Sequence, residues 1–340
     1  PSVGVCRDGT RFVPVKLVDV AGLVPGAHEG RGLGNQFLTD LNETDVLIHV
    51  VDFSGKTDIE GEATEGHDPR EDIDFLEEEL DAWYLDVLEK GIEKFETRYH
   101  GAEAAIEAEL ADQMSAFGID KDRMKRVILA EGLELDPETW EDAERADLAR
   151  EIRKRTKPMV VAANKMDTPE AQANWAEITT DPDYDHLSFV PASAHAEKAL
   201  KNADDAGVVD YTPGEADFDV VGDVSGEQAA GLERIGEFVA GYDGTGVQGA
   251  LESAVFDVLG CIAVFPGSAN GRKDEKGVFR DCFILPEGAT TEDFAFHIHS
   301  DIGEGLLHGT DCRSGRQIGT DHELAHRDVI ELVSTKQASP

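Results

Sequence analysis

Short apolar runs alternate along the chain with longer stretches in which apolar residues recur every three or four positions. Four of the short runs are rich in β-branched residues and end in polar or glycine-containing turns, which is typical of buried parallel strands. They cover residues 13–20, 46–51, 159–163 and 187–190. Because helical patterns lie between them, we predict an α/β fold with a doubly wound, mostly parallel sheet. Ligands bind such sheets beyond the carboxyl ends of the strands, so the turns after these runs are the candidate site.

Residues 69–156 lie between the second and third runs, and this insert is far longer than an ordinary crossover connection. Its apolar residues recur at helical spacing from Ile73 to Ile92, which predicts an amphipathic helix, and the pattern resumes after Gly101. A further helix is expected to start at Asp136-Pro137, with Asp as the cap and Pro in the first turn. We interpret the insert as a helical subdomain, either a lid on the sheet or an arm that contacts a macromolecule.

From residue 260 onward the pattern changes to short strand-like runs around one helix. These runs cover residues 261–265, 281–285 and 329–333, and Thr290 or Thr291 can cap a helix that continues to about residue 300. The segment 267–277 is charged and contains several glycines, which is typical of an exposed loop. We therefore predict a small α+β domain in this part of the chain.

The chain has 340 residues, of which 71 are acidic and 31 are basic, so its formal net charge is −40. The acidic excess is spread along the chain and favours a surface adapted to concentrated salt, where a Debye length of about 3 Å screens self-repulsion. It argues against a polyanion-binding face, and we expect no DNA partner. The four cysteines form no CxxC pair and no apolar run is long enough to cross a bilayer. We therefore expect a reduced, cytoplasmic protein without a membrane partner.

The residues Asn164-Lys165-Met166-Asp167 directly follow the third predicted strand and match the NKxD pattern of guanine recognition. The carboxylate of Asp167 can accept hydrogen bonds from both the ring N–H and the exocyclic amino group of guanine. Asn164 can reach the base edge and tie neighbouring loops together, and the aliphatic stem of Lys165 can cover the ring. Adenine lacks those two donors, and sites built on such pairing discriminate by as much as about 10⁴–10⁵. The alternative interpretation is a helix-capping turn after a strand.

Two further motifs accompany NKxD in the order that nucleotide binding requires. Asp19-Val20-Ala21-Gly22 closes the first predicted strand and matches DxxG. In that pattern Asp19 holds Mg²⁺ through a water molecule and the backbone N–H of Gly22 binds the γ-phosphate. Ser193-Ala194 follows the fourth predicted strand, and a backbone N–H of this loop can contact the guanine carbonyl.

Residues 19–37, with the sequence DVAGLVPGAHEGRGLGNQF, closely resemble the switch region of the Obg-like, YchF-related translation-factor GTPases. The resemblance is closest to an archaeal, salt-adapted branch and covers nearly the whole chain. It implies a P-loop-NTPase-like G domain in two parts (1–68 and 157–259), the helical insert (69–156) and a C-terminal TGS domain of the β-grasp fold (260–336). It also implies GTP or GDP with Mg²⁺ as ligands. The partner it implies is the ribosome or ribosomal RNA, contacted through the TGS domain and the insert.

The phosphate-binding loop of this family, GxxxxGK[ST], does not occur in the sequence. Gly55-Lys56-Thr57 resembles its tail, but the position five residues earlier is Val50, inside a predicted strand, and we expect no helix to follow. The resemblance places the loop and the first switch before Pro1, so we interpret the chain as N-terminally truncated and expect negligible GTP hydrolysis from it. The alternative function is a nucleotide-controlled module that binds RNA or the ribosome with little turnover.

Leu23 directly follows the DxxG glycine, where many GTPases place a glutamine that orients the attacking water. This resembles the hydrophobic-substituted GTPase class. We hypothesise that His28 helps to position the water as a catalytic residue, and the alternative is a surface histidine on a loop. His322-Glu-Leu-Ala-His326 matches the HExxH zinc-protease pattern, but a strand follows it and a third ligand is missing, so we reject it as a metal site.

Overall fold

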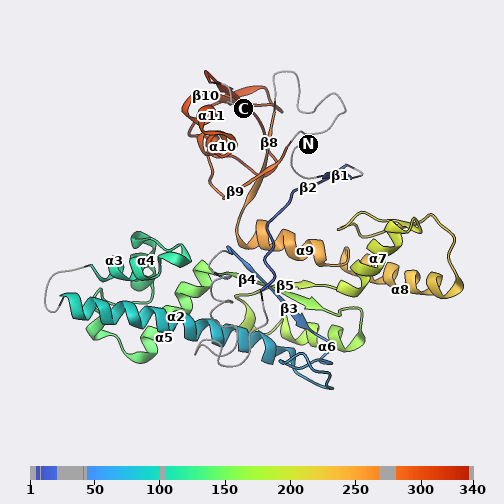
Figure 1. Cartoon of the computed structure of the whole chain (residues 1–340), viewed down its shortest axis with the longest axis horizontal. Coiled ribbons are helices and arrows are strands. Elements are labelled where there is room, and N and C mark those ends of the chain that lie inside the picture. Colours follow the sequence, from blue (N-terminus) through green and yellow to red (C-terminus); the bar gives the residue numbers. More distant parts are fainter. Residues whose placement is uncertain are drawn as a thin grey trace. The chain divides into compact units, whose positions relative to one another are not determined.

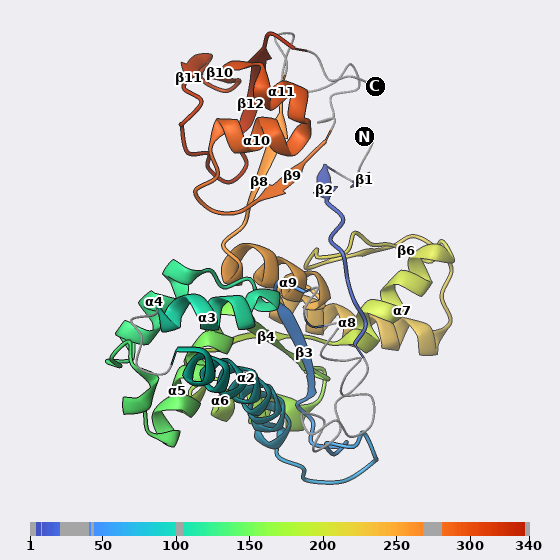
Figure 2. The same ribbon diagram turned by 60° about the vertical axis from the view of Figure 1, so that its left-hand side comes forward.

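The computed structural model describes residues 5–7, 9–20, 41, 44–99, 105–267 and 281–336. The chain forms two compact units (Figures 1 and 2), one of Val18–Ala254 and one of Pro1–Leu17 together with Val255–Pro340. Within the described residues, no helix is both long enough and apolar enough to cross a membrane.

A three-stranded parallel sheet lies inside the first unit. Its order is β3 (Leu47–Asp52), β4 (Met159–Asn164) and β5 (Ser188–Pro191), and Asp52 lies beside Asn164 in the register of the ladder. The first five residues of β4 are buried, as expected for a central parallel strand covered on both faces. Parallel strands are therefore confirmed at 46–51, 159–163 and 187–190, but the predicted burial holds for β4 alone. β3 and β5 are partly exposed, and Val50 in β3 exposes 62 % of its surface.

The prediction of a buried strand at residues 13–20 is wrong. A short hairpin of β1 (Val5–Arg7) and β2 (Thr10–Phe12) precedes this segment, which pairs with none of the described strands. Val15 and Leu17 expose 36 % and 68 % of their surface. A β-branched run becomes a strand only where a neighbouring strand takes up its backbone hydrogen bonds, and no described strand does so here.

Helices and short elements follow β4 and β5 in the first unit. Three of the helices begin at hydroxyl caps: Thr168 Oγ1 accepts the N–H of Ala171 at 3.4 Å, Ser193 Oγ accepts the N–H of Ala196 at 3.1 Å, and Ser225 Oγ accepts the N–H of Gln228 at 3.3 Å. A core that includes Phe53, Val161 and Met166 packs between these elements and the sheet. The elements are α6 (Pro169–Ile178), η4 (Pro182–Tyr184), α7 (Ala194–Asp205), β6 (Val209–Asp210), β7 (Asp219–Val220), α8 (Gly226–Tyr242) and α9 (Val247–Glu252).

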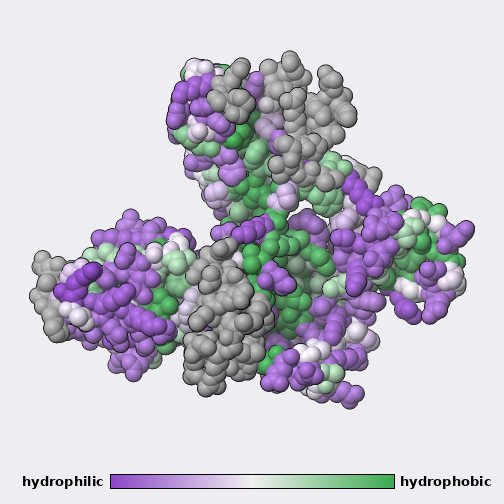
Figure 3. Space-filling view, in the orientation of Figure 1, coloured by the Kyte–Doolittle hydropathy of each residue, from purple (hydrophilic) through white to green (hydrophobic). Residues whose placement is uncertain are grey.

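The predicted helical insert forms a helical subdomain with its own hydrophobic core. The predicted helix start at Asp136-Pro137 needs a correction, because Asp136 caps only the single 3₁₀ turn η3 (Pro137–Thr139). The indole N–H of Trp140 then donates to the carbonyl of Glu134 at 2.8 Å, and the chain is extended at Trp140 before the next helix begins. The face of this subdomain that Figure 3 shows is dominated by hydrophilic residues. Its elements are α2 (Pro69–Tyr99), α3 (Ile106–Gln113), η2 (Ser115–Phe117), α4 (Lys121–Ala130), η3 and α5 (Asp142–Thr156).

A buried arginine joins α5 to α2. The side chain of Arg153 is only 2 % exposed, and its Nη2 donates to Oε1 of Glu77 at 2.7 Å while its Nε donates to Asp81. Glu77 also contacts Nε2 of His186, which precedes β5, at 2.9 Å. Burial alone would raise the pKa of Glu77, but the hydrogen bond from His186 and the charge of Arg153 outweigh it and lower that pKa. The subdomain is therefore attached to the sheet through paired charges as well as apolar contacts.

The second unit contains a five-stranded sheet in the order β11-β10-β12-β8-β9, in which only β12 and β8 run parallel. The three predicted strands and the helix capped by Thr290 are confirmed, whereas two strands of a hairpin, β10 and β11, were not predicted. The helix ends at Ile298, because His299 Nδ1 accepts the N–H of Asp301 at 3.1 Å and starts a separate helix. The predicted loop 267–277 lies outside the described residues except for Gly267. The elements are η5 (Ser253–Val258), β8 (Ile262–Pro266), β9 (Phe283–Leu285), α10 (Thr291–Ile298), α11 (Ser300–Glu304), β10 (Leu306–Asp311), β11 (Arg316–Ile318) and β12 (Val329–Ser334).

Candidate functional site

The NKxD residues form the turn between the end of β4 and the start of α6. Lys165 adopts a left-handed backbone with φ of 65°, which costs a non-glycine residue on the order of 1–3 kcal/mol and persists only where the surroundings impose it. Here the Met166 N–H donates to the carbonyl of Ala192 at 3.1 Å, and Thr168 Oγ1 donates to the carbonyl of Lys165 at 2.9 Å. Met166 is fully buried. The turn is therefore fixed from both sides and presents Lys165 and Asp167 on a rigid backbone.

The ammonium group of Lys165 is held by Asp52 at the end of the neighbouring strand β3. Lys165 Nζ lies 2.7 Å from Oδ2 of Asp52, which also accepts the hydroxyl of Thr57 at 2.7 Å. Oδ1 of Asp52 accepts the hydroxyl and the N–H of Ser54 at 2.6 and 2.9 Å. Burial alone would raise the pKa of Asp52, but these hydrogen bonds, that of Lys165 foremost, hold it well below its usual range. Asp52 was not predicted as a site residue; its signal in the sequence is a carboxylate that closes the strand next to NKxD.

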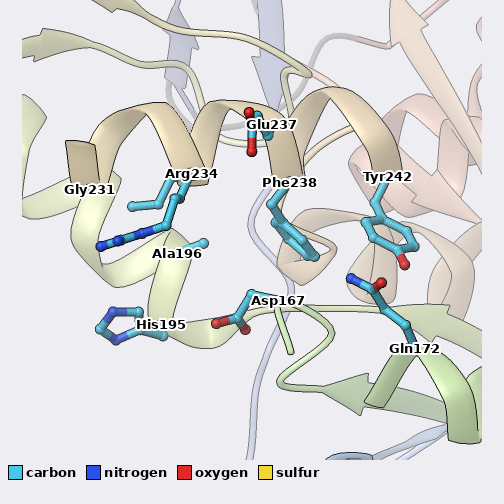
Figure 4. A pocket seen from close by; sticks show the side chains of 10 residues that line it. Asp167, Gln172, His195, Ala196, Gly231, Arg234, Glu237, Phe238 and Tyr242 are labelled. Atoms are coloured by element: carbon cyan, nitrogen blue, oxygen red, sulfur yellow. The ribbon is translucent and has the colours of Figure 1, made fainter. Parts of the chain in front are cut away.

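The carboxylate of Asp167 is exposed and makes no hydrogen bond or ion pair to any described residue. It faces α8, from which Phe238 projects towards it, while the guanidinium of Arg234 lies above His195 (Figure 4). Together these side chains line a pocket of ≈ 540 Å³. Because both carboxylate oxygens are unpaired, Asp167 can accept two hydrogen bonds from a ligand. The lining residues are Asp167, Gln172, His195, Ala196, Gly231, Arg234, Ile235, Glu237, Phe238 and Tyr242.

The Ser193–Ala194 loop lies directly beside the NKxD turn. Asn164 Oδ1 accepts the backbone N–H of Ala194 at 3.1 Å, so the asparagine ties the two loops together as its pattern predicts. The loop is also joined to the sheet, because the Ala192 N–H donates to the carbonyl of Ala163 at 2.8 Å. Asn164, Lys165, Asp167, Ser193 and Ala194 are thus brought together at the carboxyl ends of β4 and β5.

The other predicted site residues do not join this group in the part of the chain that the structure describes. Asp19 lies in the exposed segment before residue 21, and its side chain makes no hydrogen bond or ion pair to any described residue. Gly22, Leu23 and His28 lie outside the described residues.

Neither of the two rejected motifs, the phosphate-loop tail and HExxH, adopts the geometry that its proposed function requires. Turns and bends follow Gly55-Lys56-Thr57 up to α2, and Lys56 pairs with Glu170 at 3.1 Å. His326 lies in a turn and His322 in irregular backbone, so neither is on a helix. His326 Nδ1 accepts the N–H of Ala263 at 3.2 Å, and its ring packs edge-on against Phe256 with 4.9 Å between centroids. His326 therefore fastens β8 inside the second unit.

A parallel sheet whose strand ends carry a rigid NKxD turn and an adjoining Ser-Ala loop defines a nucleotide-binding protein of the GTPase class. Three family models match the chain. They are the 50S ribosome-binding GTPase model over residues 5–90, the Obg-like GTPase YGR210-like, G4 motif-containing domain over residues 162–268, and the TGS domain over residues 270–334.

Relatives that match this chain over most of their own length support the same assignment. A GTP-binding protein of Methanocaldococcus jannaschii is 39 % identical over 98 % of this chain and 84 % of its own length. A GTP-binding protein of Schizosaccharomyces pombe is 34 % identical over 85 % of this chain and 73 % of its own length. The crystal structure of a GTP binding protein from Pyrococcus horikoshii OT3 superposes with a TM-score of 0.76 at 34 % identity, over 98 % of this chain and 87 % of that chain. The chain belongs to the Obg-like, YchF-related family of GTP-binding proteins with a TGS domain.

Proposed function

We propose that this chain binds the base of a guanine nucleotide between the NKxD turn and the Ser193–Ala194 loop. Asp167 accepts the two donors of the guanine edge, and the stem of Lys165 covers the ring. A backbone N–H of Ser193–Ala194 donates to the guanine carbonyl. The observation that carries this proposal is the Asp167 carboxylate, which has no partner among the described residues while the turn around it is firmly bonded.

The phosphate side of the site is proposed from the DxxG motif. Asp19 would hold Mg²⁺ through a water molecule, and the metal would neutralise charge on the phosphates. The carboxylate of Asp19 is exposed and has no partner among the described residues, which is compatible with that role. The backbone N–H of Gly22 would bind the γ-phosphate, and His28 would help to position the attacking water.

We also propose a partner for this chain and a role for each of its domains. A protein of Haemophilus influenzae named ribosome-binding ATPase YchF is 34 % identical over 37 % of this chain and 39 % of its own length. We propose that this chain likewise acts in the cytoplasm beside the ribosome. Residues 1–68 and 157–259 would form the G domain, 69–156 the contacting insert, and 260–336 the TGS domain that meets ribosomal RNA or protein.

The base preference is the direct test of the proposed site. Ligand-observed NMR of the 340-residue chain with GDP and with ADP measures the two affinities even where both are weak. We expect GDP to bind at least about tenfold more tightly, because ADP leaves the Asp167 carboxylate without its two donors. Equal affinities for GDP and ADP would overturn the assignment of the base site.

A nucleotide-controlled binding module with little turnover is the second candidate function, and Leu23, which stands where many GTPases place a water-orienting glutamine, favours it. Phosphate release from GTP, measured with and without ribosomes, separates the two. Release that ribosomes stimulate supports a GTPase, and binding without release supports the module.

A further inference from the structure

We propose that Thr245 and Gly246, which follow α8, are positioning residues that set the guanine-recognition loop Ser193–Ala194. This inference rests on the proposed function, because it concerns the same base site. Neither residue belongs to a nucleotide-binding motif, and both act through the loop without contacting the base.

Thr245 is completely buried and bonds to the loop on two sides. Its carbonyl accepts the N–H of Ser193 at 2.9 Å. Its hydroxyl donates to Oε2 of Glu197 at 2.7 Å, in the first turn of the helix that Ser193 caps. The same carboxylate oxygen accepts the hydroxyl of Tyr211 at 2.7 Å. Burial and the neighbouring Glu197 raise the pKa of Tyr211 to about 12, so this hydroxyl stays protonated and remains a donor.

Gly246 touches the other side of the loop so closely that only glycine fits. A Cβ added at this position would lie 1.9 Å from the carbonyl oxygen of Pro191 and 2.7 Å from Cα of Ala192. Both contacts are to backbone, which cannot turn aside as a side chain can. The residue also has a φ of 80°, in the left-handed region that favours glycine. Any side chain here would therefore displace the segment that leads into the recognition loop.

These contacts decide which amide of the loop can serve a ligand. The N–H of Ser193 points inward to the carbonyl of Thr245, and the hydroxyl of Ser193 is used as the cap of α7. The next amide, that of Ala194, is bonded only to the side chain of Asn164 at 3.1 Å. An amide side chain can turn towards the base edge, whereas a buried backbone carbonyl cannot. We call the contacts of Thr245 and Gly246 with this loop the brace. The brace leaves the Ala194 N–H as the donor for the guanine carbonyl.

Four variants of the 340-residue chain test this inference through the ratio of GDP to ADP affinity. We expect Gly246→Ala to reduce the ratio about tenfold or more, and Thr245→Val to reduce it about 3- to 10-fold, the effect of one buried hydrogen bond. Thr245→Ser retains the hydroxyl and is expected to behave as the parent chain. Gly241→Ala, in α8 with no atom within 4 Å of the added Cβ, is the matched control and is also expected to leave the ratio unchanged.

Amide hydrogen exchange provides the second readout, independent of nucleotide. The Ser193 amide should exchange at least about tenfold faster in Gly246→Ala and Thr245→Val, while the amides of β4 stay protected. Unchanged exchange together with an unchanged affinity ratio would overturn the brace. A comparison with Asp167→Asn distinguishes the hypothesis of the base site from that of the brace. If Asp167→Asn alters the base preference and Gly246→Ala does not, the brace is refuted and the base site stands. If neither alters it, the base site fails first.

Discussion

The ammonium nitrogen of Lys165 lies 2.7 Å from Oδ2 of Asp52, at the carboxyl ends of two neighbouring parallel strands. The contact directs the lysine stem, which is the part that can cover a base of any kind. Asp52→Asn removes the charge but preserves the shape. We expect it to weaken GDP and ADP binding alike, by about 3- to 10-fold, because the stem makes no base-specific hydrogen bond. Titration of both nucleotides checks this, and a selective loss of GDP alone would contradict it.

The same ion pair predicts a pH dependence of stability. The pKa of Asp52 is lowered in the folded chain, so its contribution to the free energy of unfolding is complete above the ordinary carboxyl pKa of about 3.9. That contribution is lost as the pH falls from there towards the lowered value. Chemical unfolding can be measured between about pH 6 and pH 3, which spans the carboxyl range. Over this range the free energy of unfolding should fall less steeply for Asp52→Asn than for the parent chain.

Replacement of Asp167 by asparagine should change which base is preferred. The carboxamide offers an N–H donor where the carboxylate was an acceptor, so it cannot satisfy the exocyclic amino group of guanine. Xanthine carries a carbonyl at that position and can accept this donor. We expect Asp167→Asn to lose about tenfold or more of its GDP affinity and to gain affinity for XDP, as measured by ligand-observed NMR.

The matched control for that experiment is Asp205→Asn, which alters an exposed carboxylate at the end of α7. It carries the same change of charge and should leave the preference between GDP and XDP as it is. If both variants shift that preference equally, the effect is one of net charge, and the role of Asp167 is contradicted.

Removal of the buried arginine should destabilise the first unit strongly. Arg153→Leu leaves Glu77 and Asp81 without their shared cation in a site where the arginine side chain is only 2 % exposed. Breaking a buried pair in this way typically costs about 3–5 kcal/mol. Tryptophan fluorescence during unfolding reports on this unit, because Trp83, Trp140 and Trp175 all lie within it. Lys90→Ala, which breaks an exposed pair with Asp86, should cost at most about 1 kcal/mol.

His49 on β3 predicts a loss of stability in mild acid. Burial lowers its pKa to about 4 even though the nearby charge of Glu77 acts in the opposite direction. Its Nδ1 has no hydrogen-bond partner among the described residues. The pKa of His49 in the folded chain is below its unfolded value of about 6.5, so its contribution to the free energy of unfolding is complete above that pH. This contribution is lost as the pH falls towards 4, by up to about 3 kcal/mol. In His49→Leu, unfolding free energies between pH 7 and pH 4 should decline less steeply; an identical decline would refute the assignment.

The sequence predicted the parts of the fold that depend on local pattern. The buried run of β4 has no other stable environment than a covered parallel sheet, and Thr290 caps its helix by local hydrogen bonds. The run 13–20 has the same composition but no pairing strand in the described residues, and pattern alone cannot supply a neighbour. The hairpin β10–β11 was missed because β11 has only three residues and both strands are only partly buried.

Some residues of the candidate site likewise follow from a local sequence pattern, and others do not. Asn164, Lys165 and Asp167 were predicted because the chemistry of guanine needs those side chains at that spacing. Asp52 was missed because its contact with Lys165 joins positions 113 residues apart, which no local pattern encodes. Thr245 was missed for another reason: its carbonyl bonds to Ser193, and any residue has a carbonyl, so only the folded chain distinguishes it.

The long helix α2 has a mechanical consequence. Its 31 residues, at about 1.5 Å each, make a rigid rod of about 46 Å that extends through the helical subdomain (Figure 1). The rod starts next to the loop that holds Asp52: the N–H of His67 donates to the carbonyl of Gly55 at 3.2 Å, and His67 Nε2 contacts Asp72 of α2 at 2.8 Å. A tilt of about 5° at that end would swing the tip by about 4 Å. A small movement beside Lys165 that tilts α2 is thus amplified into a larger displacement of the far end of the helix.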